Sequence, residues 1–269
     1  MLKVGIVGCG SIGTILCRAI TEHPADLELV SVFDRHTEHS KRLVSTLACT
    51  PAIEDVPQMA GHVDVIVECA SISAVPEVAR ISLINGCDVM IMSVGALSNT
   101  HLKNELINLA EKNNVMIHIP SGAIIGVDGI KSAKIAGINK VTLRTKKHPE
   151  SLKGARYIKE KGINLDAINK ETMIFKGTVE GATGAFPANI NVATTLALAS
   201  GIENLSVEIY ANPELRRNVH EIIIEGGFGK FEISVENVPS PANPKTSYLA
   251  ALSAITTLKQ MTKPLQIGT

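Results

Sequence analysis

Hydrophobic positions in the first 120 residues alternate between two spacings. Short continuous apolar runs, typical of strands buried on both faces, are followed by apolar residues at the three- and four-residue spacing of a helix. The helical spacing predicts helices that begin near Ile12, Val75 and Leu102. The apolar runs predict strands at residues 2–7, 27–33, 64–70, 88–94 and 115–119. Strands and helices that alternate in this way predict a parallel sheet covered by helices on both faces.

The pattern changes after Pro120. Residues 121–137 are rich in small side chains and are expected to be partly helical, whereas residues 140–147 alternate as a half-exposed strand does. A buried helix is predicted at 190–199, and an amphipathic helix at 247–261 follows a proline-rich loop. Further strands are predicted at 172–179, 204–210, 218–225 and 230–237, the last two joined by a glycine-rich hairpin.

Composition excludes several classes of protein. Lys plus Arg and Asp plus Glu each number 26 in 269 residues, Trp is absent and aromatic residues make up 3%. A neutral chain with few aromatic side chains disfavours nucleic-acid binding. We find no apolar stretch of about 18 residues, so we expect no membrane span. Met1-Leu2-Lys3 leads directly into a strand-like run without a cleavage signal, so secretion is not expected either.

The five cysteines are odd in number, lie in apolar surroundings and form no C-x-x-C pair. This pattern favours buried free thiols over a disulfide framework, and a reducing cytoplasmic compartment. The cysteines are Cys9, Cys17, Cys49, Cys69 and Cys87.

A glycine-rich motif directly follows the first predicted strand. Gly8, Gly10 and Gly13 form G-x-G-x-x-G, while Ser11 and Ile12 open the following helix. In dinucleotide-binding proteins the first glycine permits a tight turn, the second lets a pyrophosphate approach the backbone, and the third lets helix and strand pack closely. The N–H groups and positive dipole end of the helix then bind phosphate. We therefore predict a dinucleotide site, to which Ala70, at the end of the third predicted strand, is also assigned.

Asp34 ends the second predicted strand and decides which dinucleotide is expected. Its carboxylate can accept the hydroxyls of the adenosine ribose and would repel a ribose 2′-phosphate, which favours NAD. Arg35 could instead hold that phosphate, so NADP is the alternative. His36 and His39 have a spacing that could bind a metal, but no third ligand is in view, so we expect a solvated loop and no metal site.

Four segments of the second half, together with the glycine motif, resemble the L-aspartate dehydrogenase family. The resemblance extends over essentially the whole chain, and the segments are specific in combination rather than singly. They are Pro120-Ser121-Gly122-Ala123-Ile124, Phe186-Pro187-Ala188-Asn189-Ile190-Asn191, Asn218-Val219-His220-Glu221-Ile222 and Asn243-Pro244-Lys245-Thr246-Ser247.

This resemblance implies a fold and an activity. The family oxidises L-aspartate with NAD or NADP to iminoaspartate, which hydrolyses to oxaloacetate and ammonia and can also feed NAD biosynthesis. The implied fold is α/β: a Rossmann-type doubly wound parallel sheet over residues 1–120, plus a second α/β substrate domain over residues 121–245 with a mostly antiparallel or mixed sheet. The second domain would also form a homodimer, and a C-terminal helix within residues 246–269 would pack back on the first domain.

The resemblance also assigns residues. It implies that His220 is the active-site residue and that Ala123 and Asn189 contact the nicotinamide end of the cofactor. From the residues alone, a histidine in a strand is more often structural, and Asn189 could simply cap a helix. Imidazole nevertheless suits the chemistry, because amine oxidation needs a group that accepts a proton near neutral pH.

The two carboxylates of aspartate require cations or N–H donors. Lys147, and Lys245 with Thr246 in the late loop, are the predicted substrate contacts. Arg144, Lys146 and His148 are further candidates, but in an alternating strand only every second side chain faces the same side. The family usually has Arg-Lys-Pro-Pro where this chain has Lys146-Lys147-His148-Pro149. This departure leaves the identity of the substrate cation open.

Two other classes of function compete with this reading. One is another two-domain oxidoreductase of the dihydrodipicolinate-reductase or homoserine-dehydrogenase type, which would share the dinucleotide-binding half. The other is a non-catalytic NAD-sensing protein, which would need a partner-binding or DNA-binding appendage. The segment around His220 favours the dehydrogenase of aspartate.

Overall fold

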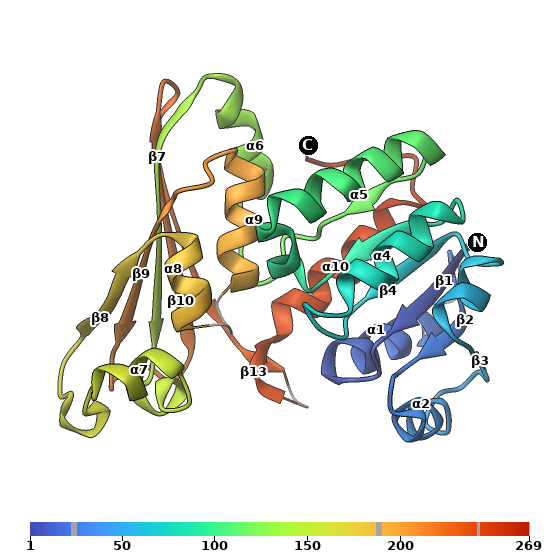
Figure 1. Cartoon of the computed structure of the whole chain (residues 1–269), viewed down its shortest axis with the longest axis horizontal. Coiled ribbons are helices and arrows are strands. Elements are labelled where there is room, and N and C mark those ends of the chain that lie inside the picture. Colours follow the sequence, from blue (N-terminus) through green and yellow to red (C-terminus); the bar gives the residue numbers. More distant parts are fainter. Residues whose placement is uncertain (23–25, 187–189, 241–242, 269) are drawn as a thin grey trace. The chain divides into compact units, whose positions relative to one another are not determined.

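The computed structural model describes residues 1–22, 26–186, 190–240 and 243–268 (Figure 1). The chain forms two compact units, one made of residues 1–122 and 250–267 and the other of residues 123–249 together with Gly268. We call them the first and second units.

The first unit contains a six-stranded parallel sheet in the order β3-β2-β1-β4-β5-β6. The order reverses between β1 and β4, and ligands of doubly wound sheets bind at the carboxyl ends of the strands at such a point. The strands are β1 (Leu2–Val7), β2 (Leu27–Phe33), β3 (Ala52–Ile53), β4 (Val65–Glu68), β5 (Asp88–Ile91) and β6 (Ile117–His118). The predicted parallel sheet is confirmed.

Helices of the first unit connect these strands and cover the sheet (Figure 1). They are α1 (Ser11–Glu22), α2 (Thr37–Val44), α3 (Val56–Ala60), α4 (Val75–Ile84), α5 (Thr100–Asn113) and α10 (Tyr248–Gln260), with a 3-10 turn at Val94–Ser98. The last of them, α10, comes from the far end of the sequence. Its Ala254 and Leu258 are fully buried in one hydrophobic cluster with Val4, Leu16 and Val67. The core of the first unit is therefore completed by residues that follow the second unit in the sequence.

The second unit contains a five-stranded mixed sheet in the order β11-β10-β7-β9-β8. Its pairs are antiparallel except for the parallel pair of β7 and β9. The strands are β7 (Ile138–Lys147), β8 (Thr172–Gly177), β9 (Ser206–Ala211), β10 (Asn218–Gly226) and β11 (Gly229–Asn237). The helices are α6 (Val127–Ile135), α7 (Arg156–Lys161), α8 (Val179–Ala185) and α9 (Ile190–Ser200). The prediction of a mixed second sheet is confirmed.

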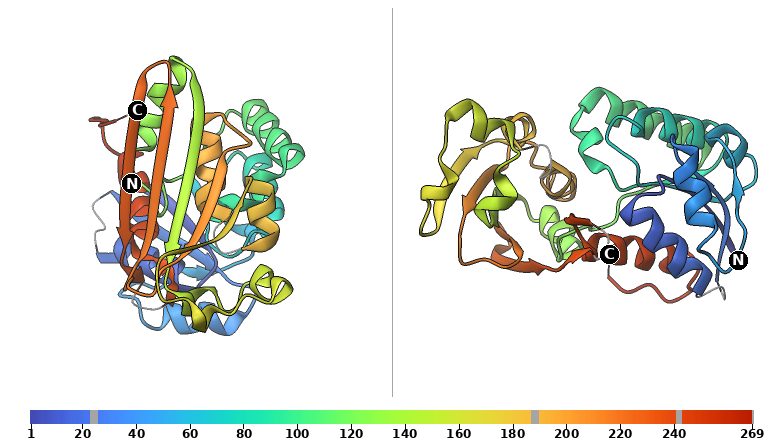
Figure 2. Two further views of the ribbon diagram at one scale, coloured as in Figure 1. Left: turned by 90° about the vertical axis from the view of Figure 1, so that its left-hand side faces the viewer. Right: turned by 90° about the horizontal axis from the view of Figure 1, so that it is seen from below.

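The two faces of this sheet differ in chemistry. On the central strand β7, Val141 and Leu143 belong to the hydrophobic core of the second unit, whereas Arg144 and Lys146 point to the opposite face. Helices α6, α8 and α9 lie on the apolar face (Figure 1), and the charged face is turned to the viewer in the left view of Figure 2. We call these the core face and the charged face.

One local prediction was wrong. The segment Asn243-Pro244-Lys245-Thr246-Ser247 was expected to be a loop, but it forms the strand β13 (Asn243–Ser247), which pairs with β12 (Pro239–Ser240). A two-stranded ribbon has only edge strands, and an edge strand tolerates a proline because it need not donate every N–H. The ribbon carries this motif in an extended conformation.

Candidate active site

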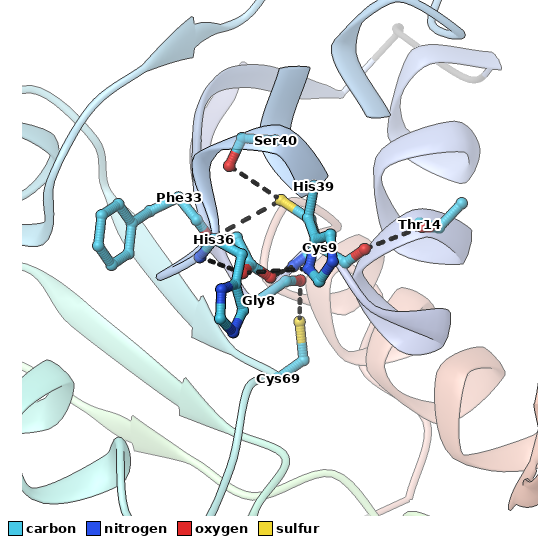
Figure 3. A network of polar contacts seen from close by, with 9 residues as sticks. Gly8, Cys9, Thr14, Phe33, His36, His39, Ser40 and Cys69 are labelled. Carbon is cyan, nitrogen blue, oxygen red and sulfur yellow. Dashed lines mark hydrogen bonds and ion pairs between the residues drawn. The ribbon is translucent and has the colours of Figure 1, made fainter. Parts of the chain in front are cut away.

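The glycine turn between β1 and α1 is closely packed at two of its three glycines. Gly8 has a φ of +102°, and a Cβ there would lie 2.7 Å from the carbonyl of Cys69. A Cβ on Gly13 would lie 1.9 Å from the carbonyl oxygen of Gly8. No other residue fits at these positions without moving the backbone. The local contacts of this turn are drawn in Figure 3.

Gly10 differs from these two because its surroundings are open. It is exposed, and a Cβ there would meet no atom within 4 Å. Ser11 and Ile12 follow in the first turn of α1, and the N–H of Thr14 closes that turn on the carbonyl of Gly10. Open space over a glycine backbone at a helix N-terminus is what a pyrophosphate requires. The residues of the turn therefore fit a dinucleotide.

Asp34 stands beside this turn at the end of β2. Its Oδ2 accepts the N–H of Cys9 at 2.9 Å, its Oδ1 accepts the N–H of His36 at 2.8 Å, and His39 Nδ1 lies 3.4 Å from Oδ1. Partial burial alone would raise the pKa of Asp34, but these N–H donors and His39 hold it below its usual value. Asp34 is therefore a carboxylate at neutral pH, suited to accept ribose hydroxyls. Arg35, the next residue, is exposed.

Two thiols pack against the same turn. Cys69 Sγ lies 3.3 Å from the carbonyl oxygen of Gly8, and Cys9 Sγ lies 3.6 Å from Ser40 Oγ (Figure 3). Burial raises the pKa of both thiols. They are protonated packing groups, and all five cysteines of the chain are free.

Ala70 lies in the loop after β4, on the other side of β1 from Asp34. Ala70 is exposed, and its N–H donates to Glu68 Oε1 at 2.8 Å. Glu68 was not among the residues predicted from the sequence, although a signal was present. It is the one charged residue that ends the apolar run Val65–Val67, and it is fully buried.

In the second unit, His220 and Thr145 face each other across the sheet. They are directly opposed in the pairing of β10 and β7, and His220 Nδ1 lies 3.0 Å from Thr145 Oγ1. His220 is 6% exposed and lies on the core face. Burial, with a smaller contribution from the charge of Lys147, lowers the pKa of His220 to about 3. The expectation that His220 titrates near neutral pH is therefore wrong for the protein without substrate: its imidazole is neutral.

Lys147 shares the core face with His220, because it lies two residues after Thr145 on β7. Burial lowers the pKa of Lys147 to about 8. Among the residues that the structure describes, no carboxylate pairs with Lys147. It is a half-buried cation beside a neutral imidazole, an arrangement that suits an anionic ligand.

The other basic candidates have partners elsewhere. Arg144 pairs with Glu208 at 2.8 Å, and Lys146 pairs with Glu221 at 2.7 Å, both on the charged face. His148 Nδ1 accepts the N–H of Glu150 and begins a 3-10 turn. Of the four candidates on this segment, Lys147 is the one that lies with His220.

A buried asparagine links three of the segments that carried the family resemblance. Asn237 is 3% exposed; its Nδ2 donates to the carbonyl of Ala123 at 3.0 Å, and its Oδ1 accepts the hydroxyl of Ser247 at 2.6 Å. Asn237 is also opposite Asn218 in the pairing of β10 and β11. The side chain of Asn237 thus joins Ala123 to β13, and its strand β11 pairs with β10, the strand of His220. Asn237 was not predicted from the sequence, where its only signal is a polar residue two positions after Val235, which also points to the core face.

Some predicted residues cannot be placed in this description. Asn189 lies outside the described residues, and so does the side chain of Lys245. Thr246 is half-buried in β13. Within the described ranges, no group of three His, Cys, Asp or Glu residues could hold a metal ion, and His36 and His39 are exposed. In the same ranges, no helix is long and apolar enough to cross a membrane.

Comparison with known proteins agrees with these features. Residues 8–120 match the family model described as "Homoserine dehydrogenase, NAD binding domain". With the glycine turn and Asp34, this match defines an NAD(P)-dependent oxidoreductase. Residues 128–261 match the model "Aspartate dehydrogenase, C-terminal". L-aspartate dehydrogenases of Methanococcoides burtonii and Methanosarcina mazei are 49% and 50% identical to this chain, with 100% of each sequence covered. The chain belongs to the L-aspartate dehydrogenase family.

Solved structures give the same result. The chain is similar to aspartate dehydrogenase from Thermotoga maritima, with a TM-score of 0.78 and 28% identity over 100% of both chains. An amine dehydrogenase from Mycobacterium smegmatis has a TM-score of 0.62 at 13% identity, covering 96% of this chain and 91% of its own, and shows the fold alone. The dinucleotide-binding half does not separate the aspartate family from homoserine dehydrogenases, whereas the second half does.

Proposed function

We propose that this chain catalyses the NAD(P)-dependent oxidation of L-aspartate to iminoaspartate, which hydrolyses to oxaloacetate and ammonia. The observation that carries this proposal is the pair of the buried His220 and the half-buried Lys147 on the core face, in a chain whose other unit has a dinucleotide turn. The dinucleotide supplies the hydride acceptor. The reaction converts the amino acid with a neutral amine, and the oxidised dinucleotide, into the imine, the reduced dinucleotide and one proton.

Lys147 is proposed to bind a carboxylate of the substrate. It is a half-buried cation that forms no ion pair with a protein carboxylate in the described part of the chain, so it can neutralise an incoming one. Lys245 and Thr246 remain proposals for the second carboxylate. Lysine binds as a point charge rather than as a planar fork, so orientation must come from other donors.

His220 is proposed to accept the proton of the substrate ammonium. If its Nδ1–H donates to Thr145 Oγ1, the lone pair of Nε2 is free to act as the base. The arrival of a substrate with two carboxylates raises the proton affinity of the imidazole, because a nearby negative charge favours the charged form. In the free protein the low pKa of His220 leaves its imidazole unprotonated, and the negative charge of the bound substrate raises its basicity.

Asp34 is proposed to select NAD, with NADP as the alternative through Arg35. We expect Asp34→Ala to weaken NAD binding and to improve NADP binding, because a carboxylate accepts ribose hydroxyls and repels a 2′-phosphate. Arg35→Ala should weaken NADP more than NAD. Titration of each variant with both dinucleotides checks the assignment. Unchanged NAD affinity together with unimproved NADP affinity in Asp34→Ala would show that Asp34 does not hold the ribose.

Further proposals concern context. A cytoplasmic location is supported by the five free thiols. A homodimer, the contact of Ala123 and Asn189 with the nicotinamide end, and a link to NAD biosynthesis follow from the family.

The deciding experiment for the activity is a spectrophotometric scan for NADH formation across amino and hydroxy acids. L-aspartate should be the best substrate, and a preference for homoserine or another hydroxy acid would contradict the proposal.

A further inference from the structure

The carboxylate of Glu68 is fully buried at the carboxyl end of β4. It follows Val65, Ile66 and Val67, which are also fully buried. The single charged residue of β4 therefore lies at the carboxyl end of the strand. A buried carboxylate costs folding free energy unless hydrogen bonds compensate for its lost water. The hydrogen bonds that compensate for the burial of Glu68 therefore indicate its role in the protein.

Four donors converge on this carboxylate. Glu68 Oε1 accepts the N–H of Ala70 at 2.8 Å, the N–H of Ser71 at 3.0 Å and the hydroxyl of Ser93 at 2.9 Å. Oε2 accepts the N–H of Ser93 at 3.0 Å. Burial raises the pKa of Glu68, but the four donors favour its charged form. No basic side chain in the described ranges forms an ion pair with it.

These bonds join two loops. Ala70 and Ser71 belong to the loop after β4, and Ser93 follows β5, the neighbouring parallel strand. The first of these loops also packs on the glycine turn, since a Cβ on Gly8 would lie 2.7 Å from the backbone nitrogen of Ala70. A movement of Glu68 would therefore displace both loops and the turn beside them.

The position of these loops relates them to one half of the dinucleotide. Asp34 ends β2 on one side of β1, and Glu68 and Ser93 follow β4 and β5 on the other side. A dinucleotide with its adenosine ribose at Asp34 and its pyrophosphate over the glycine turn extends its nicotinamide half over the carboxyl ends of β4 and β5.

We propose that Glu68 is a positioning residue for the nicotinamide half of the cofactor, because its carboxylate holds the loops after β4 and β5 where that half binds. The proposal rests on the dinucleotide site assigned above. Glu68 need not touch the cofactor: it acts through the backbone of Ala70, Ser71 and Ser93.

The test compares the binding of NAD⁺ with that of ADP-ribose, which lacks the nicotinamide. Dissociation constants are measured by calorimetry for the wild type, Glu68→Gln and Ser93→Ala, and kcat is measured with L-aspartate at saturating NAD⁺. Glu105→Gln is the control, because it removes the same charge from a surface pair with Arg80 in the same unit.

Glu68→Gln should weaken NAD⁺ binding about tenfold or more, the scale of a lost bond to a charged group, and ADP-ribose binding by less than about threefold. kcat should fall as well, because the nicotinamide is held out of place. Ser93→Ala should show the same pattern with smaller changes, since it removes one bond of four. Glu105→Gln should match the wild type.

Equal weakening of NAD⁺ and ADP-ribose would overturn the proposal and leave Glu68 a purely structural role. If Glu68→Gln does not fold, Ser93→Ala decides: wild-type NAD⁺ affinity and kcat in that variant would also overturn the proposal. The dissociation constants for NAD⁺ and ADP-ribose are measured without turnover, so they test the proposal even if the wild type does not oxidise L-aspartate.

Discussion

The imidazole of His220 is hydrogen-bonded through Nδ1 to Thr145 Oγ1 and is otherwise buried on the core face of the second sheet. Such enclosure makes the residue either a packed structural group or a base that is exposed only to a bound substrate. The two roles predict different kinetics when the ring is removed.

We expect His220→Ala to keep NAD binding and to lose about 100-fold or more in kcat, the usual scale for a removed acid–base group. Steady-state kinetics with L-aspartate, beside NAD titration by fluorescence, measures both quantities. His148→Ala is measured beside it, because His148 begins a 3-10 turn instead of facing Thr145, so we expect its kcat to stay near that of the wild type. Equal losses of NAD binding and kcat would make His220 structural, and near-wild-type turnover would place the base elsewhere, with His148 the next candidate.

Lys147 should give substrate binding a pH dependence. Because its pKa is lowered to about 8, its charge is present below that pH and disappears above it. We expect the KM for L-aspartate to rise by up to about tenfold per pH unit above pH 8. Lys147→Arg keeps the positive charge at every pH, so this rise in KM should disappear in the variant. The substrate amine ionises in the same way with both proteins, so it does not account for a difference between them. A KM that is constant from about pH 7 to 9.5 in the wild type would show that Lys147 does not bind a carboxylate.

At the scale of elements, long apolar runs predicted the structure well and short segments did not. The runs at Leu2–Val7 and Leu27–Phe33 become β1 and β2 with the same bounds. By contrast, β3, α3, α7 and α8 have two to seven residues, too few to display a period, and were not predicted.

The separation of the site residues along the sequence decided which of them could be predicted. The glycine turn is a local motif, because its residues act on neighbours in sequence. The bond from Asn237 to the carbonyl of Ala123 joins residues 114 positions apart, and only the folded chain brings them together. The family resemblance named His220 and Ala123, but not the side chain that connects their surroundings.

Helix α10 offers a test at this scale. Leu258 is fully buried in the core of the first unit, so Leu258→Ala should lower the free energy of unfolding by about 2–5 kcal/mol. Leu252 on the same helix is 38% exposed, and Leu252→Ala should cost less than about 1 kcal/mol. Urea unfolding followed by circular dichroism gives both values. Equal effects of the two substitutions would mean that α10 does not complete this core.

The molecule as a whole is expected to be a homodimer that uses the charged face of the second sheet. Light scattering should give twice the 28.6 kDa of the chain. Ile223, half-buried on that face between strands β7 and β11, is the residue to change: Ile223→Arg should separate the protomers. Ile135→Arg, at a position 92% exposed on α6, is the control. A mass near 28.6 kDa for the wild type at micromolar concentration would contradict the dimer.

The order in which a ribosome releases this chain has a consequence for the first unit. Its sheet strands are synthesised within the first 118 residues, but Ala254 and Leu258, which close its core, emerge only after the whole second unit. Until then the other apolar residues of this cluster lack the neighbours in α10 that exclude water from them in the folded protein. They include Val4, Leu16 and Val67. The second unit has all its strands and helices in one continuous stretch and can complete its own core first. The second unit of the nascent chain should therefore complete its core before the first unit does, the reverse of their order in the sequence.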